Sequence, residues 1–141
     1  MTRVQFLHGA PDRLAATAQW LHAAWQRRQP VMVYVPVRQT AEQLDRLLWS
    51  QPSTGFLPHC DIASPLANET PIVLASNLDK LPHDRCLLNL GNELPPGFSR
   101  FVELVEIVST DDADRLPARD RFKFYRERGY DIEARDIGGE C

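Results

Sequence analysis

Hydrophobic residues occur along the chain in short apolar runs that alternate with longer amphipathic stretches. The runs at residues 4–7 and 31–35 come first, and the second is almost entirely apolar with several β-branched residues, which is typical of a strand buried on both faces. Further strands are predicted at residues 72–75, 86–90, 102–108 and 130–137. The pattern therefore predicts six strands spread over the whole chain.

Three stretches between these runs have apolar residues at helical spacing. The first covers residues 12–28, with Asp12 as its expected N-cap. The second is expected to open at Thr40, where Gln43 completes a capping-box pattern. The third covers residues 114–128 and stops before a glycine.

Strands that alternate with helices indicate βαβ units and parallel pairing. We therefore predict an α/β fold, a single three-layer Rossmann-like domain with a mainly parallel sheet, over residues 1–137. The remaining residues, 138–141, are expected to form a frayed C-terminal tail.

Composition and charge narrow the class of protein. Hydrophobic residues make up 43% of the chain and charged residues 25%, as in ordinary globular domains. The net charge of −3 disfavours direct binding of single-stranded DNA, so contact with nucleic acid is expected only indirectly. Neither a membrane-spanning apolar run nor a signal-peptide pattern is found, and the three cysteines are widely spaced. We expect a cytoplasmic protein without membrane contact.

A Rossmann-like pattern raises the question of a nucleotide site. The turn after the first strand, residues 8–12, contains one glycine, and neither G-x-G-x-x-G nor G-x-x-x-x-G-K-[ST] occurs in the chain. We therefore predict no nucleotide-binding loop, no cofactor and no catalytic residues. The alternative interpretation is an enzyme with the same Rossmann-like fold, either a nucleotide hydrolase or a metal-dependent hydrolase.

Two short segments contain residue types that bind zinc. They are His59-Cys60 and His83-x-x-Cys86, and their spacing does not match the known zinc patterns. We interpret Cys86 as a buried strand residue and the histidines as loop residues, and we predict no metal site.

An aromatic residue lies off the apolar stripe of the second helix. Trp49 is about 140° around the helix from Leu44, away from the stripe that also contains Leu47 and Leu48. Residues 56–59 (Phe-Leu-Pro-His) add apolar bulk shortly afterwards. Two interpretations are open: these residues form the hot spot of an interface, or they cover the edge of the sheet.

The last predicted helix is basic although the chain is acidic overall. Its cations are Arg115, Arg119, Arg121, Lys123, Arg126 and Arg128. Arg115 and Arg119 are one turn apart, and Phe122 and Arg126 continue the same row. Such a face suits an acidic peptide or a terminal carboxylate. The alternative is a solvated face with salt bridges to Asp120 and Glu127.

These two regions also carry a resemblance to a known family. Residues 44–49 (LDRLLW) with 56–59 (FLPH), and residues 119–126 (RDRFKFYR) with the following Gly129-Tyr130, resemble two motifs of the DNA polymerase III chi subunit family. The order of elements and the length agree as well, so the resemblance covers nearly the whole chain.

The resemblance implies a non-catalytic accessory subunit of the clamp-loader part of the replicative polymerase, acting in DNA replication. It implies two partners: the psi subunit, and the acidic C-terminal tail of single-stranded-DNA-binding protein, which ends in Pro-Phe. The psi-facing surface, here called the Trp49 surface, would comprise Trp49, Phe56, Leu57 and Pro58. The tail site would comprise Val108, Arg115, Arg119 and Arg126. A helicase is an alternative partner for the Trp49 surface.

Pro117 departs from the family pattern. Proline is tolerated in the first turn of a helix, so the last helix is expected to start late enough to keep Pro117 there. This requirement affects the position of Arg115 relative to Arg119.

Overall fold

Seven parallel strands form one sheet in the computed structural model, which describes residues 2–50 and 58–138. The strands are β1 (Arg3–Ala10), β2 (Val31–Tyr34), β3 (His59–Asp61), β4 (Ile72–Ala75), β5 (Cys86–Asn89), β6 (Glu103–Ser109) and β7 (Asp131–Asp136). Their order across the sheet is β3-β4-β2-β5-β6-β1-β7. The predicted α/β class and the parallel pairing are confirmed.

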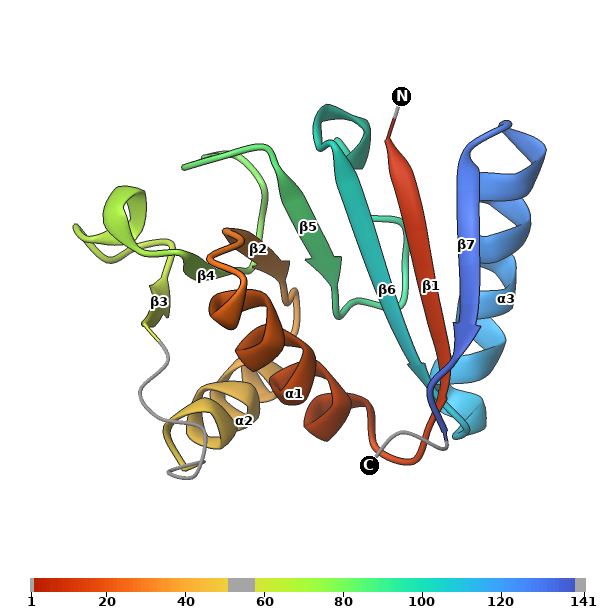
Figure 1. Ribbon diagram of the computed structural model, residues 1–141, viewed down its shortest axis with the longest axis horizontal. Helices are drawn as coiled ribbons and strands as arrows, with labels where there is room; N and C mark the ends of the chain where they lie inside the picture. Colours follow the sequence, from red (N-terminus) through yellow and green to blue (C-terminus); the bar gives the residue numbers. More distant parts are fainter. Residues whose placement is uncertain (1, 51–57, 139–141) are drawn as a thin grey trace.

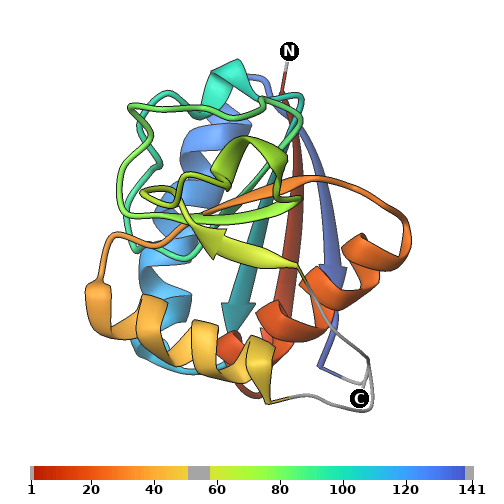
Figure 2. The same cartoon turned by 90° about the vertical axis from the view of Figure 1, so that its left-hand side faces the viewer.

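Three α-helices cover the two faces of the sheet (Figures 1 and 2). They are α1 (Arg13–Gln26), α2 (Arg38–Trp49) and α3 (Asp112–Glu127), with 3-10 turns η2 (Ala67–Glu69) and η3 (Phe98–Arg100) in the connections. Helix α1 and helix α3 lie on opposite sides of the sheet in Figure 2. The predicted three-layer arrangement is therefore confirmed. None of the helices in the described part of the chain is long and apolar enough to span a membrane.

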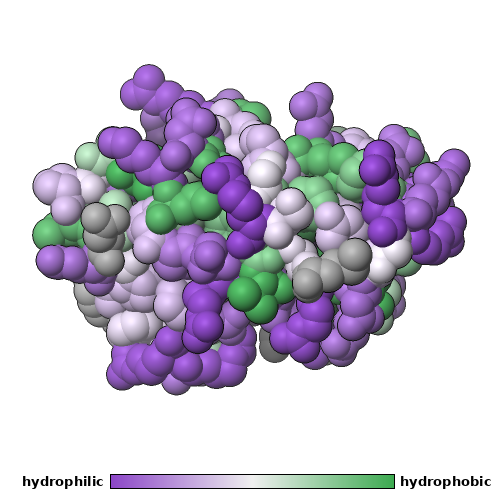
Figure 3. Space-filling view, turned by 90° about the horizontal axis from the view of Figure 1, so that it is seen from above, coloured by the Kyte–Doolittle hydropathy of each residue, from purple (hydrophilic) through white to green (hydrophobic). Residues whose placement is uncertain are grey.

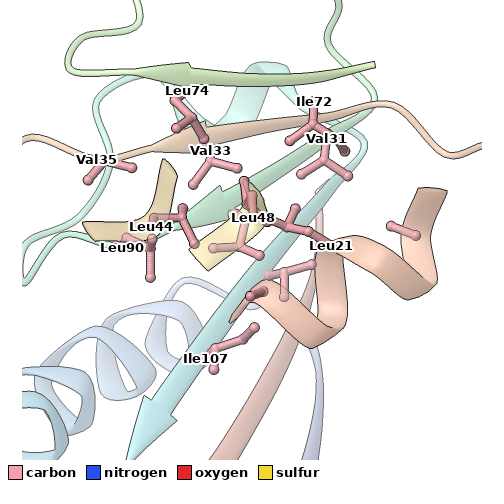
Figure 4. Close-up of a cluster of buried hydrophobic side chains, with 14 of the residues drawn as sticks. Leu21, Val31, Val33, Val35, Leu44, Leu48, Ile72, Leu74, Leu90 and Ile107 are labelled. Carbon is pink, nitrogen blue, oxygen red and sulfur yellow. The ribbon is translucent and has the colours of Figure 1, made fainter. Parts of the chain in front are cut away.

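The larger core lies between the sheet and helices α1 and α2 (Figure 4). Leu21 of α1 and Leu44 and Leu48 of α2 meet β-branched side chains of the central strands, such as Val31 and Val33. Every residue of β4 and β5 is buried, as expected for parallel strands with both faces covered. Cys86 lies buried on β5, as the sequence predicts.

The opposite face of the sheet packs against α3. Tyr125 is fully buried there, and its ring meets Phe98 edge-on with centroids 5.5 Å apart. Val4 and Leu104 contribute from the adjacent strands β1 and β6. The end of the molecule where the strands begin is mostly hydrophilic, with hydrophobic residues in small separate patches (Figure 3).

The predicted start of α2 is wrong. The helix begins at Arg38, and Val37 is its N-cap residue without a side-chain hydrogen bond. The amide of Ala41 donates to the carbonyl of Val37 at 3.1 Å, which closes the first turn before Thr40 could cap it. The path of the chain out of β2 sets this start, and it outweighs the local capping preference of Thr40.

The predicted start of α3 is also wrong. The helix begins at Asp112. The preceding residue, Asp111, is its N-cap, and the Asp111 side chain accepts a hydrogen bond from the amide of Ala113. Pro117 is consequently the sixth helical residue and does not lie in the first turn. It has no N–H for the carbonyl of Ala113, so one helical hydrogen bond is missing.

Two further differences concern strands. β1 runs from Arg3 to Ala10, beyond the predicted residues 4–7, because β6 and β7 pair with it on both sides. The short edge strand β3 has no apolar run and is not predicted by the sequence. The predicted frayed tail, residues 138–141, lies outside the described residues except for Gly138.

Polar side chains are buried between the sheet and α3. Glu106 of β6 is fully buried and accepts two hydrogen bonds from Arg121 of α3, from Nε at 2.9 Å and from Nη2 at 3.1 Å. The hydroxyl of Tyr125 donates to the same carboxylate at 2.6 Å, and Asn89 of β5 donates to it as well. Burial, followed by the negative charge of Glu106, raises the pKa of the Tyr125 phenol. This network fixes α3 on the sheet, because each buried group needs the others as partners.

His83, in the loop before β5, is expected to make folding pH-dependent. Both of its ring nitrogens are buried away from solvent. Burial lowers the pKa of His83 below its ordinary value of 6.5, and this effect outweighs the opposing influence of the Asp84 charge and of the backbone of Val31. Protonation therefore disfavours the folded state, so the stabilising contribution is present above pH 6.5 and is lost as the pH falls below it.

The measurement is urea unfolding of the parent chain and His83→Phe at about pH 7.5, 6.5 and 5.5. The free energy of unfolding of the parent chain should fall more steeply toward low pH than that of the variant. His22 has a pKa lowered by burial as well, so the variant should keep part of the dependence. Equal slopes for the two proteins would contradict the prediction.

Candidate docking surfaces

The crevice at the carboxyl ends of the strands is the place where open α/β sheets bind their ligands. Here it is a cavity of about 680 Å³, and the buried guanidinium of Arg13 lines it. Arg13 donates to the carbonyl oxygens of Ile107, Asn89 and Gly91 at 2.8–3.2 Å. The protein's own cation thus occupies the strand ends where a ligand would meet the backbone.

Two of the helix N-termini at this crevice, those of α1 and α3, are capped by carboxylates, whereas Val37 at the start of α2 has no side-chain cap. Asp12 accepts from the amide of Ala15 at 3.0 Å at the start of α1, and Asp111 caps α3. Asp114 and Glu93 also line the cavity. This lining disfavours a phosphate group, because four carboxylates surround the cavity and two of them cap the positive ends of α1 and α3. No group of three or more His, Cys, Asp or Glu residues that could hold a metal ion is found among residues 2–50 and 58–138.

A second cavity, the α3 pocket, lies between α3 and the strands β6, β1 and β7 and has a volume of about 350 Å³. It is lined by Phe6, His8, Gly9, Val108, Thr110, Arg115, Ala118, Arg119, Phe122 and Ala134. The rings of Phe6 and Phe122 meet edge-on with centroids 5.0 Å apart. The pocket is therefore apolar on the inside, with two arginines in its wall.

Local periodicity explains how these side chains meet. Phe6 and His8 are two residues apart on β1 and therefore face the same side of the sheet. Arg115, Arg119 and Phe122 follow one another at spacings of four and three residues, so they share one face of α3. Pro117 lies between the two arginines in the sequence. Both arginines line the pocket wall although one helical hydrogen bond is missing at Pro117.

Three of the four predicted tail-site residues come together in this pocket. Val108 is buried at its base, and Arg115 and Arg119 line its wall. Arg126 does not line it: its guanidinium lies 5.9 Å from the ring centroid of Phe122 and is exposed. The structure therefore separates Arg126 from the other three.

The cations of α3 differ in their surroundings. Arg121, counted among the cations of the last helix, points into the protein and pairs with Glu106. Arg115 pairs with Asp112 on the same helix, with Nη2 and Oδ1 2.5 Å apart. No carboxylate of the described residues lies within ion-pair distance of Arg119. The salt bridge predicted with Glu127 is made by Lys123, at 4.0 Å.

The Trp49 surface lies at the other edge of the sheet. Trp49 is the last residue of α2 and is 61% exposed, so it points away from the core as predicted. Its indole lies 5.0 Å from the ring of His59 on the edge strand β3, and His59 in turn contacts Asp45 at 3.1 Å. Pro58 is half-buried, and Phe56 and Leu57 lie outside the described residues. Trp49 thus contacts the sheet edge and still presents most of its surface to solvent.

Comparison with known proteins identifies the family. The family described as DNA polymerase III chi subunit, HolC, matches residues 1–133 of the chain. The chain belongs to the DNA polymerase III chi subunit family. The resemblance seen in the sequence motifs is therefore confirmed, and the chi family places the protein in DNA replication.

Named chi subunits from three bacteria are similar to this chain. DNA polymerase III subunit chi of Pseudomonas aeruginosa is 33% identical over 137 residues, which cover 94% of this chain and 95% of the relative. The chi subunit of Haemophilus influenzae is 28% identical, over 81% of this chain and 80% of its own length. That of Escherichia coli is 26% identical, over 77% and 74%. These chi proteins are by name subunits of a larger polymerase.

Several side chains of the two surfaces are not found by sequence reasoning. Phe6 and His8 line the α3 pocket from β1, about a hundred residues before α3, and Ala134 lines it from β7, which follows the helix. The alternation along β1 could have placed Phe6 and His8 on one face, but it does not say which helix covers that face. Sequence reasoning also misses Asp112, although its spacing of three residues from Arg115 is a known ion-pair spacing.

Proposed function

We propose that this chi-family protein is an adaptor without catalytic activity of its own, which links two partners in the replicative polymerase. Its α3 pocket would bind the acidic C-terminal tail of single-stranded-DNA-binding protein. Its Trp49 surface would bind the psi subunit of the clamp loader. The observation that carries the proposal is the apolar α3 pocket with Arg115 and Arg119 in its wall.

The chemistry of the α3 pocket suits a peptide that ends in an apolar residue. The terminal side chain would enter the apolar interior formed by Phe6, Val108 and Phe122. The terminal carboxylate would accept hydrogen bonds from Arg119, whose charge is not matched by a carboxylate of the described residues. Acidic residues that precede the terminus would lie near Arg115 and Arg126. Such a short peptide buries little area, so we expect micromolar affinity.

The test is a fluorescence-anisotropy titration of the full chain with a labelled acidic peptide that ends in Asp-Ile-Pro-Phe. We expect binding at about 50 mM salt that weakens strongly at about 300 mM, because salt screens exposed charges. The same peptide with a C-terminal amide is the matched control, since it lacks only the terminal negative charge. Absence of binding at low salt would refute the tail-binding proposal.

The positions of the two surfaces support a linking role. The Trp49 surface lies beside β3 and the α3 pocket beside β7, and these are the two edge strands of the sheet (Figure 1). Six interstrand steps of about 4.8 Å separate those edges by roughly 29 Å. Two partners could therefore be bound together without competing for space. Such a protein would act in the cytoplasm, at the replisome.

Trp49→Ala is expected to abolish binding of the psi subunit while leaving the fold intact. A large exposed aromatic at the centre of an interface commonly contributes about 2 kcal/mol or more, which is at least about 30-fold in affinity. Because Trp49 is mostly exposed, the free energy of unfolding should change by no more than about 1 kcal/mol. Co-purification with the psi subunit from the same organism would measure the first effect and urea unfolding the second.

Leu116→Ala is the matched control for Trp49→Ala, because Leu116 is an exposed apolar residue of α3, away from the Trp49 surface. It should leave psi binding unchanged. Retention of psi by the Trp49 variant would exclude this surface as the psi site, and a helicase would then be tested as its partner.

A further inference from the structure

The two arginines of the α3 pocket are not equally available to a ligand. Arg115 donates from Nε and Nη2 to the same carboxylate oxygen of Asp112, at 3.2 and 2.5 Å. No carboxylate of residues 2–50 and 58–138 lies within ion-pair distance of Arg119, one turn further along the helix. One pocket cation is thus paired within the protein and the other faces the cavity without such a partner.

The other acidic residues at the start of α3 are engaged elsewhere. Asp111 caps the helix through the amide of Ala113. Asp114 accepts from the hydroxyl of Ser109 at 2.5 Å and lies 3.7 Å from Arg13, on the side of the strand-end crevice. Asp112 is therefore the residue among these three that pairs with a cation of the pocket.

Asp112 and Arg115 are both accessible to an incoming ligand. Their side chains are 68% and 44% exposed, so the ion pair can open without disturbing the core. An exposed pair at a spacing of three residues is weak, and a ligand carboxylate that reaches Arg115 can displace it.

We propose that Asp112 is an internal competitor for the ligand of the α3 pocket. It occupies Arg115 in the empty pocket, which directs the terminal carboxylate of a peptide to Arg119. Arg115 then becomes available only when a second acidic group of the peptide replaces Asp112. The pocket would in this way favour peptides with several carboxylates over peptides with a terminal carboxylate alone. This inference rests on the proposed binding of an acidic tail in the α3 pocket.

The competition can be tested with Asp112→Asn and the labelled acidic peptide ending in Asp-Ile-Pro-Phe. Removing the competing charge should tighten peptide binding by about two- to fivefold, the factor by which an exposed ion pair changes an equilibrium. Asp120→Asn is the matched control, because it removes the same charge from an exposed position beside Arg119. It should change the affinity less than Asp112→Asn does.

A double-mutant cycle with Arg115→Gln separates competition from general repulsion. If Asp112 acts by occupying Arg115, Asp112→Asn should have little effect on binding once Arg115 is glutamine. The inference is overturned if Asp112→Asn has no effect, or if its effect equals that of Asp120→Asn or persists in the Arg115→Gln background. These outcomes leave the tail-binding proposal intact, whereas absence of peptide binding to both the parent chain and Asp112→Asn refutes that proposal itself.

Discussion

Replacing Arg119 by glutamate is expected to abolish binding of the acidic peptide to the α3 pocket. Arg119 lines the pocket, and its charge has no carboxylate partner among the described residues, so it is the group that would hold the ligand's terminal carboxylate. The variant loses a charge-assisted hydrogen bond and adds repulsion, and such changes cost about 2–5 kcal/mol. The affinity should therefore fall by about 30-fold or more, as measured by fluorescence anisotropy at low salt.

Lys123→Glu is the matched control for this experiment. It makes the same change in charge on the same helix, but Lys123 is exposed and does not line the pocket. Its effect on the affinity should be several-fold at most and should disappear at high salt, as expected for charges that act at a distance. Similar losses for the two variants would mean that the pocket recognises only general charge.

Breaking the buried ion pair between α3 and the sheet is expected to destabilise the protein strongly. Arg121→Met leaves the fully buried carboxylate of Glu106 without its cation. Removing one partner of a buried pair costs about 3–5 kcal/mol, a large part of the 5–15 kcal/mol that folds a typical domain. Urea unfolding followed by circular dichroism should show this loss as a lower midpoint.

The double variant Glu106→Gln with Arg121→Met tests the reason for that loss. It removes both charges, so it should be more stable than Arg121→Met alone. Lys123→Ala breaks the exposed pair with Glu127 instead and should change the free energy of unfolding by about 0.5 kcal/mol or less. A loss below about 1 kcal/mol for Arg121→Met would show that the pair contributes little to holding α3.

Much of the fold could be predicted because strands and helices leave local patterns. The apolar runs at β2, β4 and β5 are fully buried or nearly so, as their composition indicates. Helix boundaries were less predictable. Thr40 has the right chemistry for an N-cap, yet α2 begins at Arg38, because the geometry of the chain leaving β2 decides where the first turn closes.

For the candidate sites as well, local features could be predicted from the sequence and long-range contacts could not. The motif around Trp49 and the basic last helix mark both surfaces in the sequence, and the off-stripe position of Trp49 correctly indicates exposure. The roles of neighbouring cations could not be predicted. Arg119 and Arg121 are about 200° apart around the helix, and only the position of Glu106 on β6 shows which of them turns inward.

The sequence by itself determined the α/β class, the chi family and the two regions that carry its motifs, because these depend on local periodicity and on short runs of residues. Only the tertiary structure decided which side chains share the α3 pocket. That pocket needs β1 and β7 side by side beneath α3, and pairing between strands more than a hundred residues apart leaves no local pattern. The same long-range packing sends Arg121 into the core, pairs Arg115 with Asp112 at the surface and leaves Arg119 facing the pocket.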